Sequence, residues 1–213
     1  MTVAPRIPEQ DWTAERFLET DQHEFGNAWR YELIGGRIVA HAAPSPEHGA
    51  ILAGLTTALG SRLRGNPDGC RPESGSGAVP KAAQRPTARI PDAMIRCGEH
   101  PRVLFEIISP SELRNWSERD ARRRDLQAVE GAQEIVELYQ SERACHLYRR
   151  LPDDTWSFEA QGGADAILQL SSVSLAIPLS EIYEFADLAE LEPEPGAGDA
   201  GGGKPDAAPT TGG

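Results

Sequence analysis

Two carboxylates in the middle of the chain have the spacing of a paired-acid site. Asp92 precedes the apolar segment AMI, and Glu106 follows the apolar run VLF, with a short polar stretch between the two segments. If residues 97–101 form the loop of an antiparallel hairpin and Arg96 faces Arg102, Asp92 lies directly opposite Glu106. The Cβ atoms of the two acids are then roughly 5 Å apart.

Such a pair is unfavourable on apolar strands unless a cation lies between the carboxylates or one of them is protonated. Carboxylate oxygens are preferred ligands of Mg²⁺ and Mn²⁺, so this register predicts a divalent metal site. In the alternative interpretation the register is shifted by one residue, which places the acids on opposite faces of the sheet as ordinary solvated side chains.

The segments around this pair predict a mixed α/β (or α+β) domain in which helices flank a central mixed sheet. The first expected elements are a helix capped by Thr13, a hairpin that turns at Gly35-Gly36, and a helix from Ser45-Pro46 to Gly65. A Gly- and Pro-rich loop over 66–81 and the hairpin that carries the two acids follow. The last expected elements are a helix over 118–130, opened by a Ser117/Asp120 capping box, and a set of strands with a short helix over 132–188.

Four segments within these elements resemble one known family. YELIGGRIV, APSPEHGAI, IPDAMI and FEIISPS occur in this order and are similar to the Uma-type restriction endonucleases of bacteria, within the PD-(D/E)XK superfamily. The resemblance covers residues 13–188 and implies a restriction-endonuclease-like core. It also implies that Asp92 and Glu106 bind the metal and that Glu32 contributes from the preceding hairpin. A metal so bound polarises the scissile phosphate and activates a water molecule.

Two further residues in these motifs have competing interpretations. Glu32 alternates with Ile34 on a strand beside a turn, where a structural carboxylate is as good an interpretation as a ligand. His48 lies in the first turn of its helix and is more simply explained by local packing, although its family motif makes it a candidate for the rim of the site.

The chain departs from the superfamily pattern at its basic residue. Nineteen arginines accompany only two lysines, and the lysine expected two residues after Glu106 is replaced by Ile108. On the following helix the best positional match is Arg122, which shares the predicted sheet-facing stripe with Leu126 and Val129. The alternative for Arg122 is a side chain that extends past the core into water.

Arginine can hold a phosphate oxygen, but its pKa above about 12 prevents it from acting as a general base. Lys81, in a Pro-flanked loop, is expected to be solvent-exposed. We therefore expect a Mg²⁺- or Mn²⁺-dependent endonuclease acting on nucleic acid, DNA more than RNA. The alternative is a catalytically impaired protein of the same fold that serves as a nucleic-acid or protein interaction module.

The net charge of −12 argues against binding nucleic acid through a broad basic surface. Favourable contact is expected only at one pocket and at the arginine-rich segment 114–124, where acids are interleaved and salt bridges account for most of the charge. A homodimer is implied by resemblance to endonucleases that cut two strands.

The composition indicates one domain over 1–191 and a disordered acidic Gly- and Pro-rich tail over 192–213. No apolar stretch could span a membrane and no secretory signal is visible, so a cytoplasmic location is expected. Cys70, Cys97 and Cys145 lie far apart without a CxxC motif, which argues against a disulfide framework and a zinc site.

Overall fold

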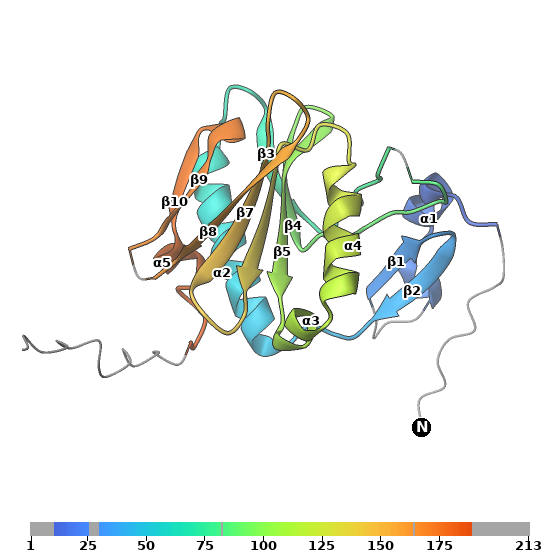
Figure 1. Cartoon of the computed structure of the whole chain (residues 1–213), viewed down its shortest axis with the longest axis horizontal. Helices are drawn as coiled ribbons and strands as arrows, with labels where there is room; N and C mark the ends of the chain where they lie inside the picture. The colour runs from blue at the N-terminus through green and yellow to red at the C-terminus, as the bar shows by residue number, and fades with distance from the viewer. Residues whose placement is uncertain (1–10, 26–29, 82, 164, 189–213) are drawn as a thin grey trace, which may run out of the picture.

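The computed structural model describes residues 11–25, 30–81, 83–163 and 165–188 and is organised around a six-stranded mixed sheet (Figure 1). The strand order is β3-β4-β5-β6-β7-β8, in which β5 and β6 are parallel and the other neighbours are antiparallel. This sheet and its flanking helices confirm the predicted fold class. Its strands are β3 (Cys70–Ser74), β4 (Ala93–Cys97), β5 (His100–Ile108), β6 (Glu134–Tyr139), β7 (Ala144–Arg150) and β8 (Trp156–Gly162).

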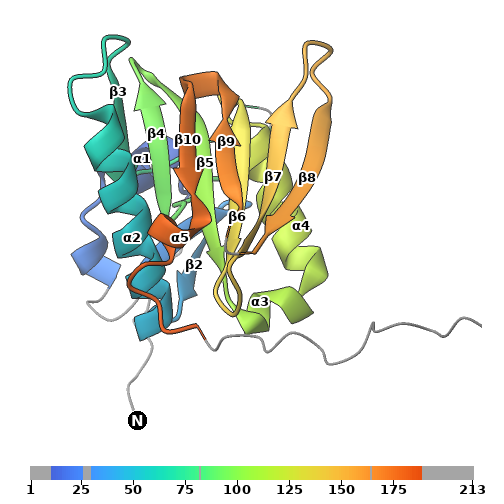
Figure 2. The same ribbon diagram turned by 90° about the vertical axis from the view of Figure 1, so that its left-hand side faces the viewer.

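Different layers cover the two faces of the sheet (Figures 1 and 2). One face packs against α2 (Pro46–Leu63), α5 (Leu179–Ile182) and the small ribbon of β9 (Ile167–Leu170) and β10 (Leu175–Pro178), with η2 (Ser171–Val173) between the last two strands. The other face packs against α4 (Trp116–Gln127), which α3 (Pro110–Arg114) precedes. The central strands β5 and β6 are therefore buried on both faces, as their apolar sequences require.

A small N-terminal unit lies beside α4. It contains α1 (Ala14–Glu19), η1 (Gln22–Phe25) and the hairpin of β1 (Arg30–Ile34) and β2 (Arg37–His41), which turns at Gly35 and Gly36 as predicted. Both glycines have positive φ, which the two-residue turn requires. The unit has its own aromatic core, and Leu33 pairs with Ala88, so the hairpin is held against the segment that leads to Asp92.

Some local predictions were wrong. The loop predicted over 66–81 contains β3, which is one of the two edge strands of the sheet. The predicted Ser117/Asp120 capping box is absent; the capping box belongs instead to Ser109 and Glu112, which open the unpredicted helix α3. The helix α4 begins at Trp116 without a side-chain cap, and β10 was not predicted.

The expectation against a disulfide also fails, because Cys70 and Cys97 are bonded. The two residues are directly paired across β3 and β4, so sheet register joins positions that are 27 residues apart in the chain. The error follows from the missed strand β3. Cys145 is a buried free thiol.

The register predicted for the hairpin of β4 and β5 is right at the end next to the two acids, away from the loop. Ala93 faces Phe105, which continues to an opposed Asp92 and Glu106. The predicted loop was too long, since Arg96 faces Pro101, and an irregularity between Ile95 and Arg96 compensates for the difference.

The domain limits 1–191 and the tail 192–213 remain predictions, because residues 1–10 and 189–213 lie outside the described part of the chain. Among the residues that the structure does describe, no helix has the length and apolar character to cross a membrane.

Candidate active site

The two central acids reach the same side of the sheet because side chains alternate along a strand. Leu104 packs in the core on the α4 side, whereas Phe105 and Ile107 pack in the core on the α2 side, so Glu106 points toward α4. A hydrogen bond of 2.8 Å from the Ile107 amide to Asp92 Oδ2 ties the Asp92 carboxylate to β5. Both carboxylates are buried.

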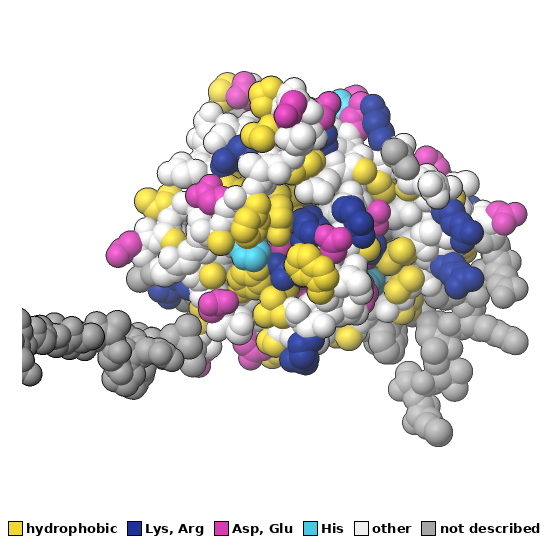
Figure 3. Space-filling view, in the orientation of Figure 1, with side chains coloured by type: hydrophobic (Ala, Val, Ile, Leu, Met, Phe, Trp, Pro, Cys, Tyr) yellow, Lys and Arg dark blue, Asp and Glu magenta, His cyan; other side chains and the backbone are white. Residues whose placement is uncertain are grey.

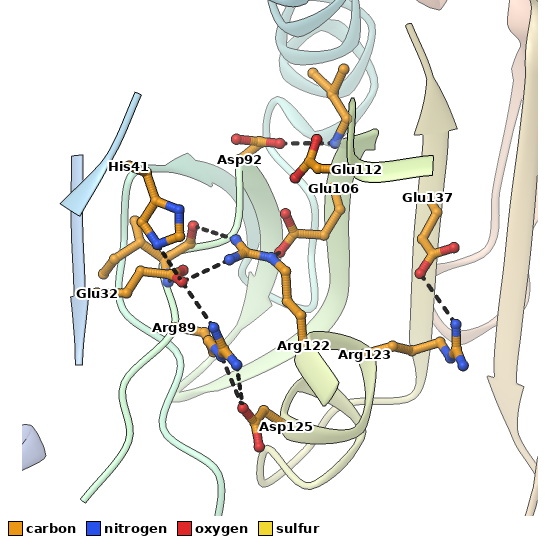
Figure 4. Close-up of polar contacts among 12 residues, drawn as sticks. Glu32, His41, Arg89, Asp92, Glu106, Glu112, Arg122, Arg123, Asp125 and Glu137 are labelled. Atoms are coloured by element: carbon orange, nitrogen blue, oxygen red, sulfur yellow. Dashed lines mark hydrogen bonds and ion pairs between the residues drawn. The ribbon is translucent and has the colours of Figure 1, made fainter. Parts of the chain in front are cut away.

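Arg122 of α4 lies between Glu32 and Glu106 (Figure 4). Its Nε is 2.9 Å from Glu106 Oε1, and its Nη1 donates to Glu32 Oε2 at 2.7 Å. Nη2 donates to the Ile90 carbonyl at 3.2 Å. The helical stripe that predicted an inward-facing Arg122 is confirmed, since Leu126 is buried beneath it, and the arginine does not extend into solvent.

Asp92 has cationic or polar partners on both oxygens. Arg30 of β1 forms an ion pair with Oδ1, and His48 Nε2 lies 3.3 Å from the same oxygen. The packing interpretation of His48 is therefore incomplete: the histidine belongs to the site, and Ser45, which caps α2, fixes the turn that aims it at Asp92.

Glu32 is fully buried and fully bonded. Oε1 accepts from the Ile90 amide at 2.7 Å, while Oε2 is approached by Arg122, by Arg89 at 3.1 Å and by His41 at 3.1 Å. Arg89 continues to Asp125 of α4, so these contacts join the β1–β2 hairpin to the helix. The structure brings Glu32 to Arg122 and gives it the contacts of a structural carboxylate.

The electrostatics divide the three acids into two kinds. Burial would raise the pKa of Glu32 and of Asp92, but in each case the surrounding partners outweigh it: Arg122, His41 and the Ile90 amide for Glu32, and His48 and Arg30 for Asp92. Both pKa values are held well below the ordinary range.

Glu106 behaves in the opposite way. Burial raises the pKa of Glu106 to about 8; Arg122 opposes this effect and the nearby Asp92 charge adds to it. Oε1 of Glu106 is buried and has no partner in hydrogen-bonding geometry, although Arg122 Nε is close. Glu106 is therefore the acid in the cluster whose charge is least compensated by its surroundings.

A cavity of about 620 Å³ adjoins this cluster. The cavity is lined by polar groups of α3, by the N-terminal end of α2, and by Arg30, His48, Asp92 and Arg122. Glu106 does not line the cavity itself, but it contacts Arg122, which does. Basic groups thus share the cavity wall with Asp92, Glu112 and Glu118.

Sequence reasoning missed three residues of this neighbourhood, namely Arg30, His41 and Arg89, whereas Arg119 belongs to the arginine-rich segment 114–124 that it singled out. A signal existed for two of them: Arg30 shares a strand face with Glu32, and His41 pairs directly with Arg30 across the hairpin. Lys81 is exposed and pairs with Glu130, as expected for a loop lysine outside the site.

The donor set suits a hard divalent cation in its chemistry, because two carboxylates converge and one buried oxygen of Glu106 lacks a hydrogen bond. Within the described ranges no group of three or more His, Cys, Asp and Glu side chains is arranged to hold a metal ion. Asp92 and Glu106 by themselves could therefore supply only part of a coordination shell, and the remaining ligands of a bound cation would have to be water or substrate.

These features define a restriction-endonuclease-like core with a paired-acid site, and comparison with known proteins agrees. The chain belongs to the Uma2 family, described as "Putative restriction endonuclease", whose family model matches residues 14–180. A search of curated proteins finds no match.

Among solved structures, the chain is similar to the crystal structure of a "putative nuclease belonging to DUF820 from Anabaena variabilis". The TM-score is 0.61 at 17% sequence identity, over 82% of this chain and 98% of the other. This similarity supports the fold, and the family match supports a nuclease.

Proposed function

We propose that the protein is a Mg²⁺- or Mn²⁺-dependent endonuclease that hydrolyses phosphodiester bonds, in DNA more than in RNA. The observation that carries the proposal is the pair of buried, opposed carboxylates, Asp92 and Glu106, on one face of the sheet in a chain of this family. Asp92 and Glu106 would hold the metal, which when bound would polarise the phosphate and activate water.

Arg122 has a defined task in this proposal. Its guanidinium occupies the space beside Glu106 and also lines the cavity. A phosphate oxygen entering the cavity offers Arg122 another anionic partner, and a guanidinium binds such an oxygen well. When Arg122 exchanges its contact with Glu106 for a contact with phosphate, the Glu106 carboxylate becomes available to a cation. Arg122 stays protonated throughout, because burial is outweighed by Glu106 and Glu32, which raise its pKa.

Glu32 and His48 act through other residues. Glu32 holds Arg122 by a hydrogen bond and is a positioning residue. His48 contacts Asp92 from the helix α2 and orients that carboxylate at the cavity wall.

Cleavage assays test the proposal. Supercoiled plasmid and single-stranded DNA are incubated with the full chain and Mg²⁺ or Mn²⁺, beside EDTA controls and the Asp92→Ala and Glu106→Ala variants. We expect metal-dependent cutting by the wild type and its loss in both variants. Equal cutting by all three proteins would overturn the proposal.

A second candidate is a nuclease-fold interaction module with an incomplete metal site. One observation favours it: the three buried acids already have arginine partners, with Arg30 at Asp92, Arg122 at Glu106 and Arg89 at Glu32. Such a cluster is close to charge balance without a metal. This candidate expects no Mn²⁺ binding at millimolar metal and no cleavage of either substrate.

A further inference from the structure

A second group of side chains lies on the α4 side of the sheet and combines four aromatic rings with one arginine. We call it the aromatic strip; its members are Trp116 at the start of α4, Arg123 two turns further along the same face of that helix, His146 and Tyr148 of β7, and Phe158 of β8.

The members of the strip are in continuous contact. The Arg123 guanidinium carbon lies 5.5 Å from the centre of the Trp116 ring and 4.7 Å from that of Tyr148. The Phe158 ring centre is 5.3 Å from Tyr148 and 4.8 Å from His146. Cation–π and ring–ring contacts at these distances hold the rings in defined orientations.

The two ends of the strip are open to solvent. Trp116 is 63% exposed and Phe158 is 57% exposed, and neither belongs to a core cluster. In Figure 3, hydrophobic side chains, a histidine and basic side chains gather over β7, β8 and α4. Large rings left this exposed at a fixed surface are typical of contact sites.

The strip adjoins the cavity of the candidate active site. Asn115, Glu118 and Arg119 line the cavity and flank Trp116 in the chain. Arg119 also donates to the Tyr139 hydroxyl at 2.7 Å and lies 3.3 Å from His146. A ligand seated in the cavity can therefore continue onto the strip.

Charge narrows the kind of ligand. Arg123 already pairs with Asp120 and Glu137, and the chain carries a net charge of −12, so the strip is poorly suited to hold a duplex through its phosphates. What it offers is ring faces. In a duplex the base faces are covered by their neighbours, whereas in a single strand they are free to stack on aromatic side chains.

We propose that the aromatic strip binds unpaired bases next to the cavity; this inference rests on the proposed function. The substrate class is then single-stranded nucleic acid or a locally unpaired segment, with Trp116 and Phe158 as the stacking residues. Because stacking rather than phosphate neutralisation supplies the affinity of the strip, the part of the binding that Trp116 and Phe158 contribute should depend only weakly on salt.

Fluorescence anisotropy in EDTA tests this without any need for cleavage. The probes are a labelled oligothymidine strand and a labelled duplex of the same length. We expect the wild type to prefer the single strand, and Trp116→Ala and Phe158→Ala each to weaken that binding by about five-fold or more. Phe158→Trp should retain it, because the ring is kept.

Phe185→Ala is the matched control, since Phe185 is 53% exposed but follows α5, which packs on the opposite face of the sheet. This variant should bind like the wild type. Equal affinity for strand and duplex, or unchanged binding by both strip variants, would overturn the inference. The inference would also be overturned if the wild type binds no single strand and analytical ultracentrifugation shows that it self-associates in a way that Trp116→Ala and Phe158→Ala abolish.

The inference and the proposed function can fail separately. If the chain binds the single strand through the strip but cuts nothing with Mg²⁺ or Mn²⁺, the nuclease proposal fails and the strip stands. If the chain cuts DNA while the strip variants bind and cut like the wild type, the strip fails and the nuclease proposal stands.

Discussion

At the scale of single residues, the site is built from carboxylates held at opposite extremes of proton affinity. Glu32 and Asp92 are surrounded by donors and keep their charge, whereas Glu106 is buried with little beyond Arg122 to compensate it. The opposed acids could be predicted from strand alternation and an assumed loop. Arg89 could not, because its contacts with Glu32 and Asp125 join segments that are distant in sequence.

Glu32→Gln tests the structural role of the most enclosed acid. Folding holds the Glu32 pKa below its ordinary value of 4.5, so its charge stabilises the protein above that pH, and the contribution is lost as the pH falls further. The variant should lose about 3 kcal/mol at pH 7, the typical cost of breaking a buried ion pair. Urea unfolding across pH measures the difference, which should shrink below about pH 4.5.

Glu184→Gln is the control for that series, because Glu184 is an exposed carboxylate on the opposite side of the molecule. It should change the free energy of unfolding by less than about 0.5 kcal/mol at every pH. A deficit of Glu32→Gln that stays constant from neutral to acid pH would show that the carboxylate charge is not what stabilises the fold.

At the scale of elements, capped and periodic segments were predictable and irregular ones were not. The helix α2 follows its Ser45-Pro46 signal, and β5 follows its apolar run. The strand β3 was hidden by its composition, since it contains Pro72; a proline is tolerated there because β3 is an edge strand. The helix α3 has only five residues, and the first two of them are the end of the family motif FEIISPS.

Two glycines of α2 should respond to alanine in opposite ways. A Cβ at Gly54 would lie 2.2 Å from the Ile182 carbonyl oxygen of α5, so Gly54→Ala must push the two helices apart. Overpacking of this kind costs about 1–3 kcal/mol. A Cβ at Gly60 meets nothing within 4 Å, so Gly60→Ala should stabilise the helix by about 0.5–1 kcal/mol. Thermal unfolding of both variants tests this prediction. A change of melting temperature in the same direction for both variants would contradict the packing of α5 on α2.

At the scale of the whole molecule, an acidic chain surrounds a cavity that four arginines line together with three acids. If the protein acts on nucleic acid as proposed, the excess of acids over bases would limit that contact to the cavity and the adjoining aromatic strip. Family membership and fold could be predicted because four motifs lie in order on elements that pack together. The disulfide could not, because it depends on the pairing of a strand that the composition concealed.

Reduction of the disulfide should weaken the fold. Cys70 and Cys97 close a loop across the edge of the sheet, and a crosslink of this kind typically contributes about 2–4 kcal/mol. We expect dithiothreitol to lower the urea midpoint of the wild type and to leave a Cys70→Ser/Cys97→Ser variant unchanged. A wild-type midpoint that does not respond to reductant would mean that the bond adds nothing to stability.

The central claim is that Asp92 and Glu106 together form a divalent metal site, and calorimetric titration with Mn²⁺ tests it most directly. The proteins are the wild type, Asp92→Asn, Glu106→Gln and the matched control Glu118→Gln, whose exposed carboxylate lines the same cavity. The account predicts that the wild type and Glu118→Gln bind Mn²⁺ alike and that Asp92→Asn and Glu106→Gln do not. Binding that is equal in all four proteins, or absent from the wild type at millimolar Mn²⁺, would contradict it.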